Sequence, residues 1–237
     1  MVIRVQFKYL FTVVFLGAIV LIGCINLSVK IHNTAAYDSP LDVLIIDAGH
    51  GGADGGAVGI DGTLESYLNL QIALKLQSIC HLYGVSTVMT RDSEKINYPE
   101  DADTLAKMKS ADQNARLRLI QDYPHGILFS IHQNYFPSQS PSGVQVLYGH
   151  DGASREVGEL LQRNLTAVLC PDNRRVATEI DENIYLLRKC DCTAVLIECG
   201  FLSNPDESAQ LKTENYQRKI ASVLLASYLQ YTDGNKK

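Results

Sequence analysis

Three short apolar runs, each ending at an ionisable residue, do most to limit what this chain can fold into. They are LDVLIIDAGH, which ends at His50, GILFSIH, which ends at His132, and AVLIE, which ends at Glu198. Short apolar runs separated by helical patterns are typical of buried strands in a parallel sheet. In open α/β sheets, ligand sites lie outside the carboxyl ends of the strands. We therefore expect these three side chains to converge in one crevice.

The rest of the chain alternates between helix-like and strand-like spacing. Apolar residues from Leu68 to Cys80 recur at helical spacing, and a β-branched strand follows at 85–90. We further expect helices over 105–122 and 154–169, strands over 127–132, 144–148, 184–187 and 194–198, and one or two closing helices from 205. This order predicts an α/β fold, as a single three-layer domain whose mostly parallel (mixed) sheet carries helices on both faces.

The N-terminus carries an uncharged apolar run, Tyr9–Ile25, preceded by Arg4 and Lys8. Such a run predicts an export signal or a membrane anchor. Its 17 residues lie at the short limit for crossing a hydrocarbon core of about 30 Å, so cleavage and anchoring both stay open. The end of the run, LIGC at Leu21–Cys24, also resembles a bacterial lipobox. Basic residues before the run and polar residues after it predict an extracytoplasmic location, exported or held at the bacterial membrane.

These features divide the chain into three parts. Residues 1–27 are the expected signal or anchor, and 28–40 lack periodicity and are expected to form a tether. Residues 41–237 form the folded domain, which leaves no length for an added binding module. The balance of 46% hydrophobic and 20% charged residues suits one globular core. A net charge of −5 makes binding of nucleic acid or an anionic membrane through bulk charge unlikely.

The six cysteines do not predict a disulfide scaffold. Without Cys24 their number is odd, and Cys190 and Cys192 are too close for an unstrained bridge along a strand. Cys80 and Cys199 lie in apolar patterns typical of buried thiols.

Glu65 joins the three strand-end residues as a candidate for the same site. It lies in TLESYLNL at the start of the first helix and can turn back towards His50. His50, His132 and Glu65 make a ligand set for a catalytic zinc ion with one position open. No HExxH motif occurs, so the sheet has to assemble the site. Each residue also has a structural explanation, such as a first-turn acid for Glu65.

Glu198 is harder to explain structurally. A carboxylate after AVLI is partly buried, and this costs free energy unless a partner such as a dication compensates. Asp47 is expected to support the loop, with a ligand role left open. The loop GHGGADGG lacks the Lys-Ser/Thr of a P-loop and the spacing of a dinucleotide site. Its glycines more simply allow close approach to His50.

Three segments, in order, resemble the signature blocks of zinc-dependent N-acetylmuramoyl-L-alanine amidases of the third amidase family. They are IIDAGHGGADGGAVGIDGTLESYLNLQIALKL, ILFSIHQN and AVLIECGFLSN. The resemblance covers about 41–231 and implies that 41–237 is a catalytic domain acting on peptidoglycan. It implies that His50, Glu65 and His132 bind Zn²⁺ and that Glu198 is the catalytic acid/base. The compact form is similar to CwlD-type sporulation amidases, which act on spore-cortex peptidoglycan in preparing muramic-δ-lactam.

The predicted chemistry is hydrolysis of the amide between the lactyl group of N-acetylmuramic acid and L-alanine. Zinc lowers the pKa of water towards about 7, and Glu198 moves the proton to the leaving amine. Asn134 and Arg188 are candidates for orienting substrate, although Arg188 is equally well explained as a surface charge. We also expect an activating or tethering protein partner, or membrane attachment through the N-terminal segment.

Several points depart from the family pattern or leave alternatives open. Gln133 stands where a small residue is usual, Cys199 follows the catalytic glutamate, and the segment 91–104 is too short for an autoinhibitory helix. A cysteine amidase using Cys199 remains an alternative, as does a non-catalytic wall-binding or partner protein on an amidase scaffold. A zinc carboxypeptidase or deacetylase would share the same metal chemistry.

Overall fold

Six strands form one mixed sheet in the order β2-β1-β3-β6-β4-β5. In this computed structural model, which describes residues 43–234, the strands are β1 (Leu44–Ala48), β2 (Thr87–Met89), β3 (Ile127–Asn134), β4 (Gln145–Tyr148), β5 (Thr178–Glu179) and β6 (Thr193–Phe201). Strands β2, β1, β3 and β6 are parallel to one another. Strand β4 runs antiparallel to β6, and β5 is parallel to β4. The predicted mostly parallel, mixed sheet is confirmed.

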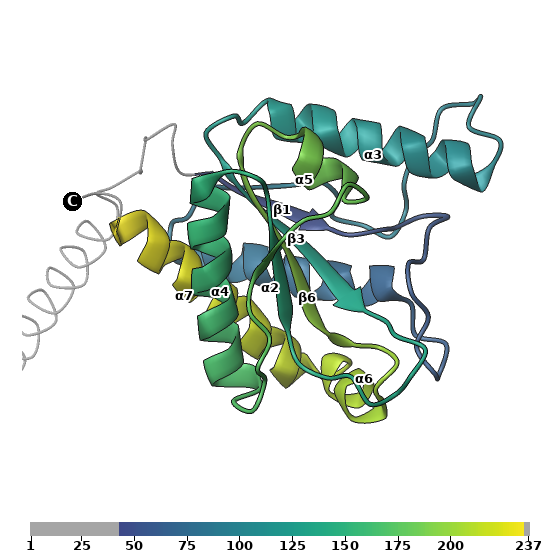
Figure 1. Ribbon diagram of the computed structural model, residues 1–237. Helices are drawn as coiled ribbons and strands as arrows, with labels where there is room; N and C mark the ends of the chain where they lie inside the picture. The colour runs from purple at the N-terminus through teal and green to yellow at the C-terminus, as the bar shows by residue number, and fades with distance from the viewer. Residues whose placement is uncertain (1–42, 235–237) are drawn as a thin grey trace, which may run out of the picture. The chain divides into compact units, whose positions relative to one another are not determined.

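Helices cover both faces of this sheet (Figure 1). They are α2 (Glu65–Leu82), α3 (Leu105–Gln121), α4 (Gly152–Leu169), α5 (Tyr185–Lys189), α6 (Pro205–Leu211) and α7 (Glu214–Gly234). Successive strand residues point to opposite faces, so Ile46 packs in the cluster that holds α2, α4 and α7. Its neighbour Ile45 packs in the cluster of α3 and α5. The three-layer prediction is therefore confirmed.

Side-chain caps fix where two of these helices begin. The Thr104 side chain accepts a hydrogen bond from the Lys107 N–H at the start of α3. Asn204 accepts from two N–H groups of α6, and Pro205 occupies its first turn. Polar caps satisfy N–H groups that have no partner inside the helix. The caps thereby set the ends of α3 and α6, which border the sheet edge where the strands finish.

The predicted strand at 184–187 is wrong, because this segment begins the short helix α5. The Arg188 N–H bonds the Ile184 carbonyl, and the Cys190 N–H bonds the Leu186 carbonyl. A short apolar run fits a strand and a buried helical turn equally well. Leu187 is buried in the same apolar cluster as α3, and this packing favours the helical conformation. The sequence pattern also does not predict β5, because this two-residue strand is exposed and carries no apolar signal.

Some expectations fall outside the described part of the chain. The signal or anchor at 1–27 and the tether at 28–40 both precede it. Between residues 43 and 234, none of the helices combines the length and the apolar character needed to cross a membrane. The five cysteines in this range are Cys80, Cys170, Cys190, Cys192 and Cys199, and all are free thiols.

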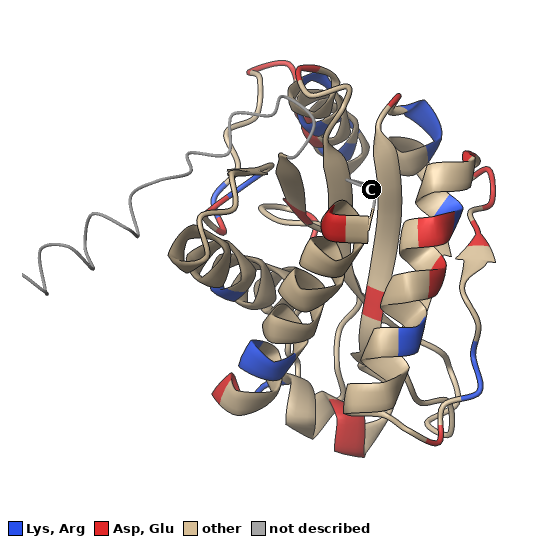
Figure 2. Cartoon of the chain, turned by 90° about the vertical axis from the view of Figure 1, so that its left-hand side faces the viewer, with Lys and Arg blue, Asp and Glu red and all other residues tan. Residues whose placement is uncertain are grey.

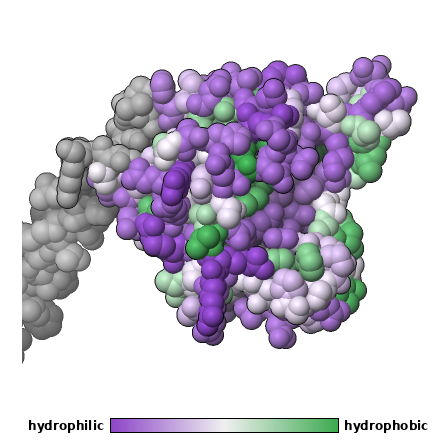
Figure 3. Space-filling model, in the orientation of Figure 1, coloured by the Kyte–Doolittle hydropathy of each residue, from purple (hydrophilic) through white to green (hydrophobic). Residues whose placement is uncertain are grey.

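The surface is mainly polar and of mixed charge. Figure 2 shows acidic and basic residues interspersed along the helices that face the viewer. Figure 3 shows a largely hydrophilic face with hydrophobic side chains in small, separate patches. Scattered apolar residues are normal on a soluble fold and need no binding partner to explain them.

Candidate active site

A cleft of about 390 Å³ lies where β1, β3 and β6 end, on the face covered by α3 and α5. Its lining includes the strand-end residues His50, His132 and Glu198 together with Glu65. His132 and Glu198 are paired neighbours in the register of β3 and β6. The sheet therefore brings together the four residues that the sequence pattern selected.

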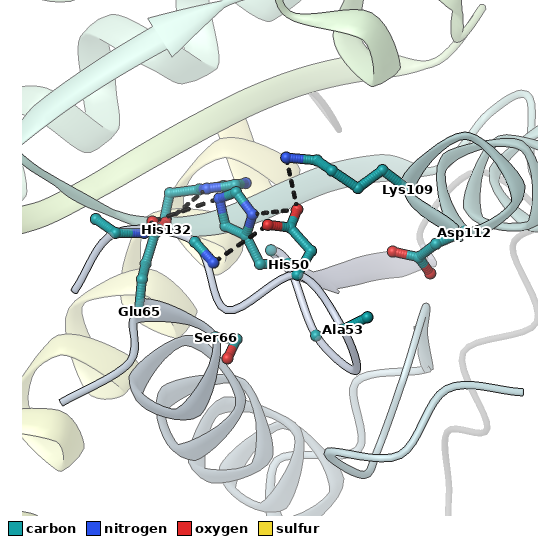
Figure 4. Close-up of polar contacts among 12 residues, drawn as sticks. His50, Ala53, Glu65, Ser66, Lys109, Asp112 and His132 are labelled. Atoms are coloured by element: carbon teal, nitrogen blue, oxygen red, sulfur yellow. Dashed lines mark hydrogen bonds and ion pairs between the residues drawn. The ribbon is translucent and has the colours of Figure 1, made fainter. Parts of the chain in front are cut away.

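His50 follows β1 and has a left-handed backbone with φ of 59°. Its Nδ1 lies 2.8 Å from the Asp54 carboxylate, and its Nε2 lies 3.4 Å from Oε2 of Glu65. Lys109 on α3 reaches Asp54 at 3.0 Å. Figure 4 shows this chain of contacts from Lys109 to His50. A carboxylate behind a histidine fixes the orientation of its ring, which is common behind metal-binding histidines.

Glu65 opens α2 and lies between the two histidines (Figure 4). Its Oε1 lies 2.9 Å from Nδ1 of His132 and accepts the Gln133 N–H at 3.1 Å. Its Oε2 accepts the Ala57 N–H at 2.8 Å. Burial raises the pKa of Glu65, but hydrogen bonds to both histidines outweigh burial and hold this pKa well below its usual range. Glu65 is therefore an ionised, fixed carboxylate.

The donor set fits a metal cation. One ligand atom from each of His50, Glu65 and His132 lies within 4.8 Å of the others, and no other such group of three occurs among residues 43–234. Burial lowers the pKa of His50, but the hydrogen bonds and charges of Glu65 and Asp54 raise it to about 9. The field that draws a proton to His50 also attracts a cation. Two imidazoles and one carboxylate match catalytic zinc sites.

Two glycines make room for this cluster. A Cβ at Gly49 would lie 2.3 Å from the His132 ring, and one at Gly56 would lie 2.6 Å from Oε2 of Glu65. Gly56 also has φ of 70°, which larger residues rarely adopt. These contacts confirm that glycines in the loop allow the backbone to approach the site closely.

Glu198 faces the same cleft without a fixed partner. Its Oε2 is buried, and no group within residues 43–234 donates a hydrogen bond to it. Burial raises the pKa of Glu198 to about 7, with a further upward contribution from the charge of Glu65. A carboxyl group with a pKa near neutrality can both accept and return a proton at neutral pH. This is the property that a general acid/base requires.

Asp47 supports the site without entering the candidate ligand set. Its carboxylate accepts from Thr90 at 2.6 Å, from Ser130 at 2.6 Å and from Arg116 at 2.7 Å. The sequence pattern predicts a supporting role for Asp47 but not the contacts of Asp54 and Arg116. The acid inside GGADGG was a usable signal for Asp54, whereas nothing local marks Arg116 within its helix.

The two candidates for orienting substrate lie in different places. Asn134 lines the cleft. Arg188 does not line it and instead lies 3.2 Å from Glu182, in a separate surface depression. The structure therefore brings Asn134, but not Arg188, to the other site residues.

Cys199 faces the core, whereas Gln133 is buried and still contributes to the lining of the cleft. Cys199 is packed in the apolar cluster with α2 and α7, where burial raises the pKa of its thiol. The Gln133 side chain donates to Asn69 on α2 at 3.1 Å. The backbone N–H of Gln133 donates to Glu65 directly, so this position contacts the candidate ligand set.

Comparison with known proteins agrees with this geometry. Residues 44–227 match the family model of N-acetylmuramoyl-L-alanine amidases, Amidase_3. The chain is 35% identical over 190 residues to the germination-specific N-acetylmuramoyl-L-alanine amidase of Bacillus subtilis (strain 168), covering 80% of this chain and 79% of that protein. This level of identity over most of both chains shows the family.

Comparison with solved structures indicates the same family. The CwlD amidase from Clostridioides difficile, in complex with the GerS lipoprotein, has a TM-score of 0.77 and 34% identity over 81% of this chain and 98% of that one. An N-acetylmuramoyl-L-alanine amidase from Clostridium difficile 630 has a TM-score of 0.70 and 27% identity over 82% and 98%. The chain belongs to the Amidase_3 family of N-acetylmuramoyl-L-alanine amidases, and it is an enzyme.

Proposed function

We propose that this chain is a zinc-dependent hydrolase of the amide bond between N-acetylmuramic acid and L-alanine in peptidoglycan. His50, Glu65 and His132 hold the zinc ion, and Glu198 is the general acid/base. One observation carries this proposal: the three ligand atoms lie within 4.8 Å of one another, in the cleft that also holds the unpartnered Oε2 of Glu198.

Each residue has a separate part in the reaction. His50, Glu65 and His132 would hold the zinc ion, which would act as a Lewis acid that lowers the pKa of water and polarises the scissile carbonyl. Glu198 takes the proton from the attacking water and delivers it to the amine of the leaving L-alanine. Asp54 holds the His50 ring in place through Nδ1, and Asn134 on the cleft wall orients the substrate.

The burial of Cys199 argues against the cysteine alternative. A nucleophilic thiol has to be ionised and accessible, whereas this one packs in the core and its pKa is raised. A non-catalytic scaffold protein would have no need for an acid with a pKa near 7 in the cleft. Zinc hydrolysis therefore accounts for more of the observed geometry than either alternative.

The biological substrate that we propose is spore-cortex peptidoglycan, in the formation of muramic-δ-lactam. The similarity to a germination-specific amidase and to a CwlD amidase supports this assignment. The CwlD structure contains the GerS lipoprotein, which supports a protein partner for this chain. Residues 1–27 export the enzyme or anchor it outside the cytoplasm.

Metal analysis tests the zinc site. The full-length chain, purified without added zinc, is expected to contain one zinc ion, and His132→Ala is expected to lose most of it. His125→Ala is the matched control, because His125 is exposed and precedes the same strand at its other end. Equal zinc contents in His132→Ala and wild type would exclude His132 from the site.

Product analysis tests the reaction and the substrate. Spore-cortex and vegetative peptidoglycan are digested with the enzyme, and the fragments are identified by mass spectrometry. We expect free stem peptides that begin with L-alanine, released mainly from cortex. Shortened peptides or deacetylated glycans instead would indicate a carboxypeptidase or a deacetylase.

A further inference from the structure

A buried arginine connects the two segments that carry His50 and Glu65. Arg91 follows β2 and is only 8% exposed. Its Nε donates to the Ala48 carbonyl at 2.8 Å, and its Nη2 donates to the carbonyls of Gly49 at 3.0 Å and Ser66 at 2.8 Å. Gly49 directly precedes one candidate ligand, and Ser66 directly follows another.

A second buried arginine, on α3, reaches the same loop. Arg116 on α3 donates through Nη1 to the Ala48 carbonyl at 2.7 Å and through Nη2 to the His50 carbonyl at 2.6 Å. The carbonyls of Ala48, Gly49 and His50 therefore all accept hydrogen bonds from these two guanidinium groups. We call Arg91 and Arg116 the arginine clamp.

The hydrogen bonds of Arg91 go to backbone carbonyls and not to acidic side chains. Within residues 43–234 it forms no ion pair with an acidic side chain, and its fourth hydrogen bond goes to the Ser93 carbonyl at 3.2 Å. Burying a guanidinium group without a carboxylate is costly. Its planar guanidinium group holds N–H donors on separate nitrogens in a fixed fork that reaches carbonyls of separate segments, whereas the N–H donors of lysine all lie on one nitrogen and cannot span the same positions.

The loop that the arginine clamp bonds contains a strained backbone conformation. His50 is the one non-glycine residue with positive φ between residues 43 and 234. A side chain in this conformation is strained and persists only where its surroundings impose it. Hydrogen bonds to the carbonyl of His50 and to the two before it fix the direction in which the His50 ring leaves the loop.

We propose that the arginine clamp positions His50 and Glu65 for metal binding. Arg91 sets the spacing between the two ligand-bearing segments, and Arg116 fixes the strained loop against α3. This inference rests on the proposed zinc site. The clamp residues are positioning residues, because neither of them belongs to the ligand set.

The test compares Arg91→Lys and Arg116→Lys with Thr90→Val in the full-length chain, purified in detergent. Thr90→Val removes one hydrogen bond, from Thr90 to Asp47, and leaves the three carbonyls untouched. Three quantities are measured: the zinc dissociation constant by chelator competition, the visible spectrum of the cobalt(II) form, and the melting temperature of the metal-free protein. The cobalt spectrum reports ligand geometry, which a loss of stability alone does not change.

We expect zinc to bind about 10- to 100-fold more weakly to both lysine variants, as for other residues that orient metal ligands, with altered cobalt bands. Thr90→Val is expected to keep the wild-type spectrum and zinc affinity. Lysine variants with wild-type affinity and spectrum would refute the clamp, even if they melt earlier. If Arg91→Lys does not fold, the zinc affinity and cobalt spectrum of Arg116→Lys test the proposal. A wild-type chain that binds no zinc would instead refute the metal site itself.

Discussion

Glu198 and Cys199 are neighbours in sequence but face different environments. Glu198 lies in the cleft and Cys199 in the core behind it. We therefore expect Glu198→Gln to lower the hydrolysis rate about 10²- to 10⁴-fold, because the general acid/base is lost. Its zinc content is expected to stay at the wild-type level. The measurements are initial rates on peptidoglycan and metal analysis of the same sample.

Cys199→Ser is the companion variant to Glu198→Gln. The hydroxyl of serine is close in size to the thiol, and the side chain at position 199 packs in the core and does not line the cleft, so most of the activity is expected to remain. An inactive Cys199→Ser variant beside a fully active Glu198→Gln variant would contradict the zinc mechanism and favour a thiol nucleophile.

Gly56 and Gly62 offer a matched pair of substitutions near the metal site. Both have positive φ, but a Cβ at Gly56 would strike Glu65 and His50, whereas a Cβ at Gly62 meets nothing within 4 Å. We expect Gly56→Ala to weaken zinc binding at least about 10-fold by displacing ligands. Gly62→Ala introduces a similar backbone strain, because Gly62 also has a positive φ. It is expected to keep wild-type zinc affinity in a chelator competition. Equal affinities in the two variants would mean that the close approach at Gly56 is not needed.

At the scale of elements, Asp47 on β1 and Arg116 on α3 join the sheet to the helix that forms one wall of the cleft. Removing one partner of a buried ion pair typically costs about 3 to 5 kcal/mol. We expect Asp47→Asn to lose about 3 kcal/mol of unfolding free energy, near the lower limit because Asp112 still pairs with Arg116. Urea denaturation measures this loss. Asp103→Asn, at an exposed pair with Lys107, is the control and is expected to change little.

The same pair predicts a dependence of stability on pH. Burial raises the pKa of Asp47, but Arg116, Ser130 and Thr90 outweigh it and lower the pKa from 3.8 to about 2. A carboxyl group whose pKa is lower in the folded state stabilises the fold above its unfolded pKa. This contribution is lost as the pH falls from about 4 to about 2. The melting temperature of wild type should therefore fall more steeply over this range than that of Asp47→Asn, and parallel curves would contradict this assignment.

At the scale of the whole molecule, the amidase fold itself occupies most of residues 43–234. Attachment to a membrane or a partner raises the effective concentration of an enzyme near its substrate. We therefore expect full-length enzyme in membranes to digest nearby peptidoglycan faster than a chain of residues 41–237 in solution. Equal rates at equal enzyme concentration would show that neither tether nor partner is required.

Much of the fold and of the site could be predicted because the signals are local. Apolar strands ending at His50, His132 and Glu198 fix a parallel sheet and the edge at which it binds ligands. The strand predicted at 184–187 failed because four apolar residues carry no unambiguous period. The contact between this segment and α3 decided its conformation.

The sequence by itself determined the α/β class, the family and the four residues that meet at the sheet edge. Strand periodicity and motif order are properties of neighbouring residues, so they can be recognised without coordinates. Only the tertiary structure decided that Asp54 orients His50 and that Arg188 lies outside the cleft. It also placed Arg91 and Arg116, 25 positions apart in sequence, so that together they bond the three successive carbonyls of Ala48, Gly49 and His50. These contacts depend on how β1, α2 and α3 pack together, and no short stretch of sequence encodes such an arrangement.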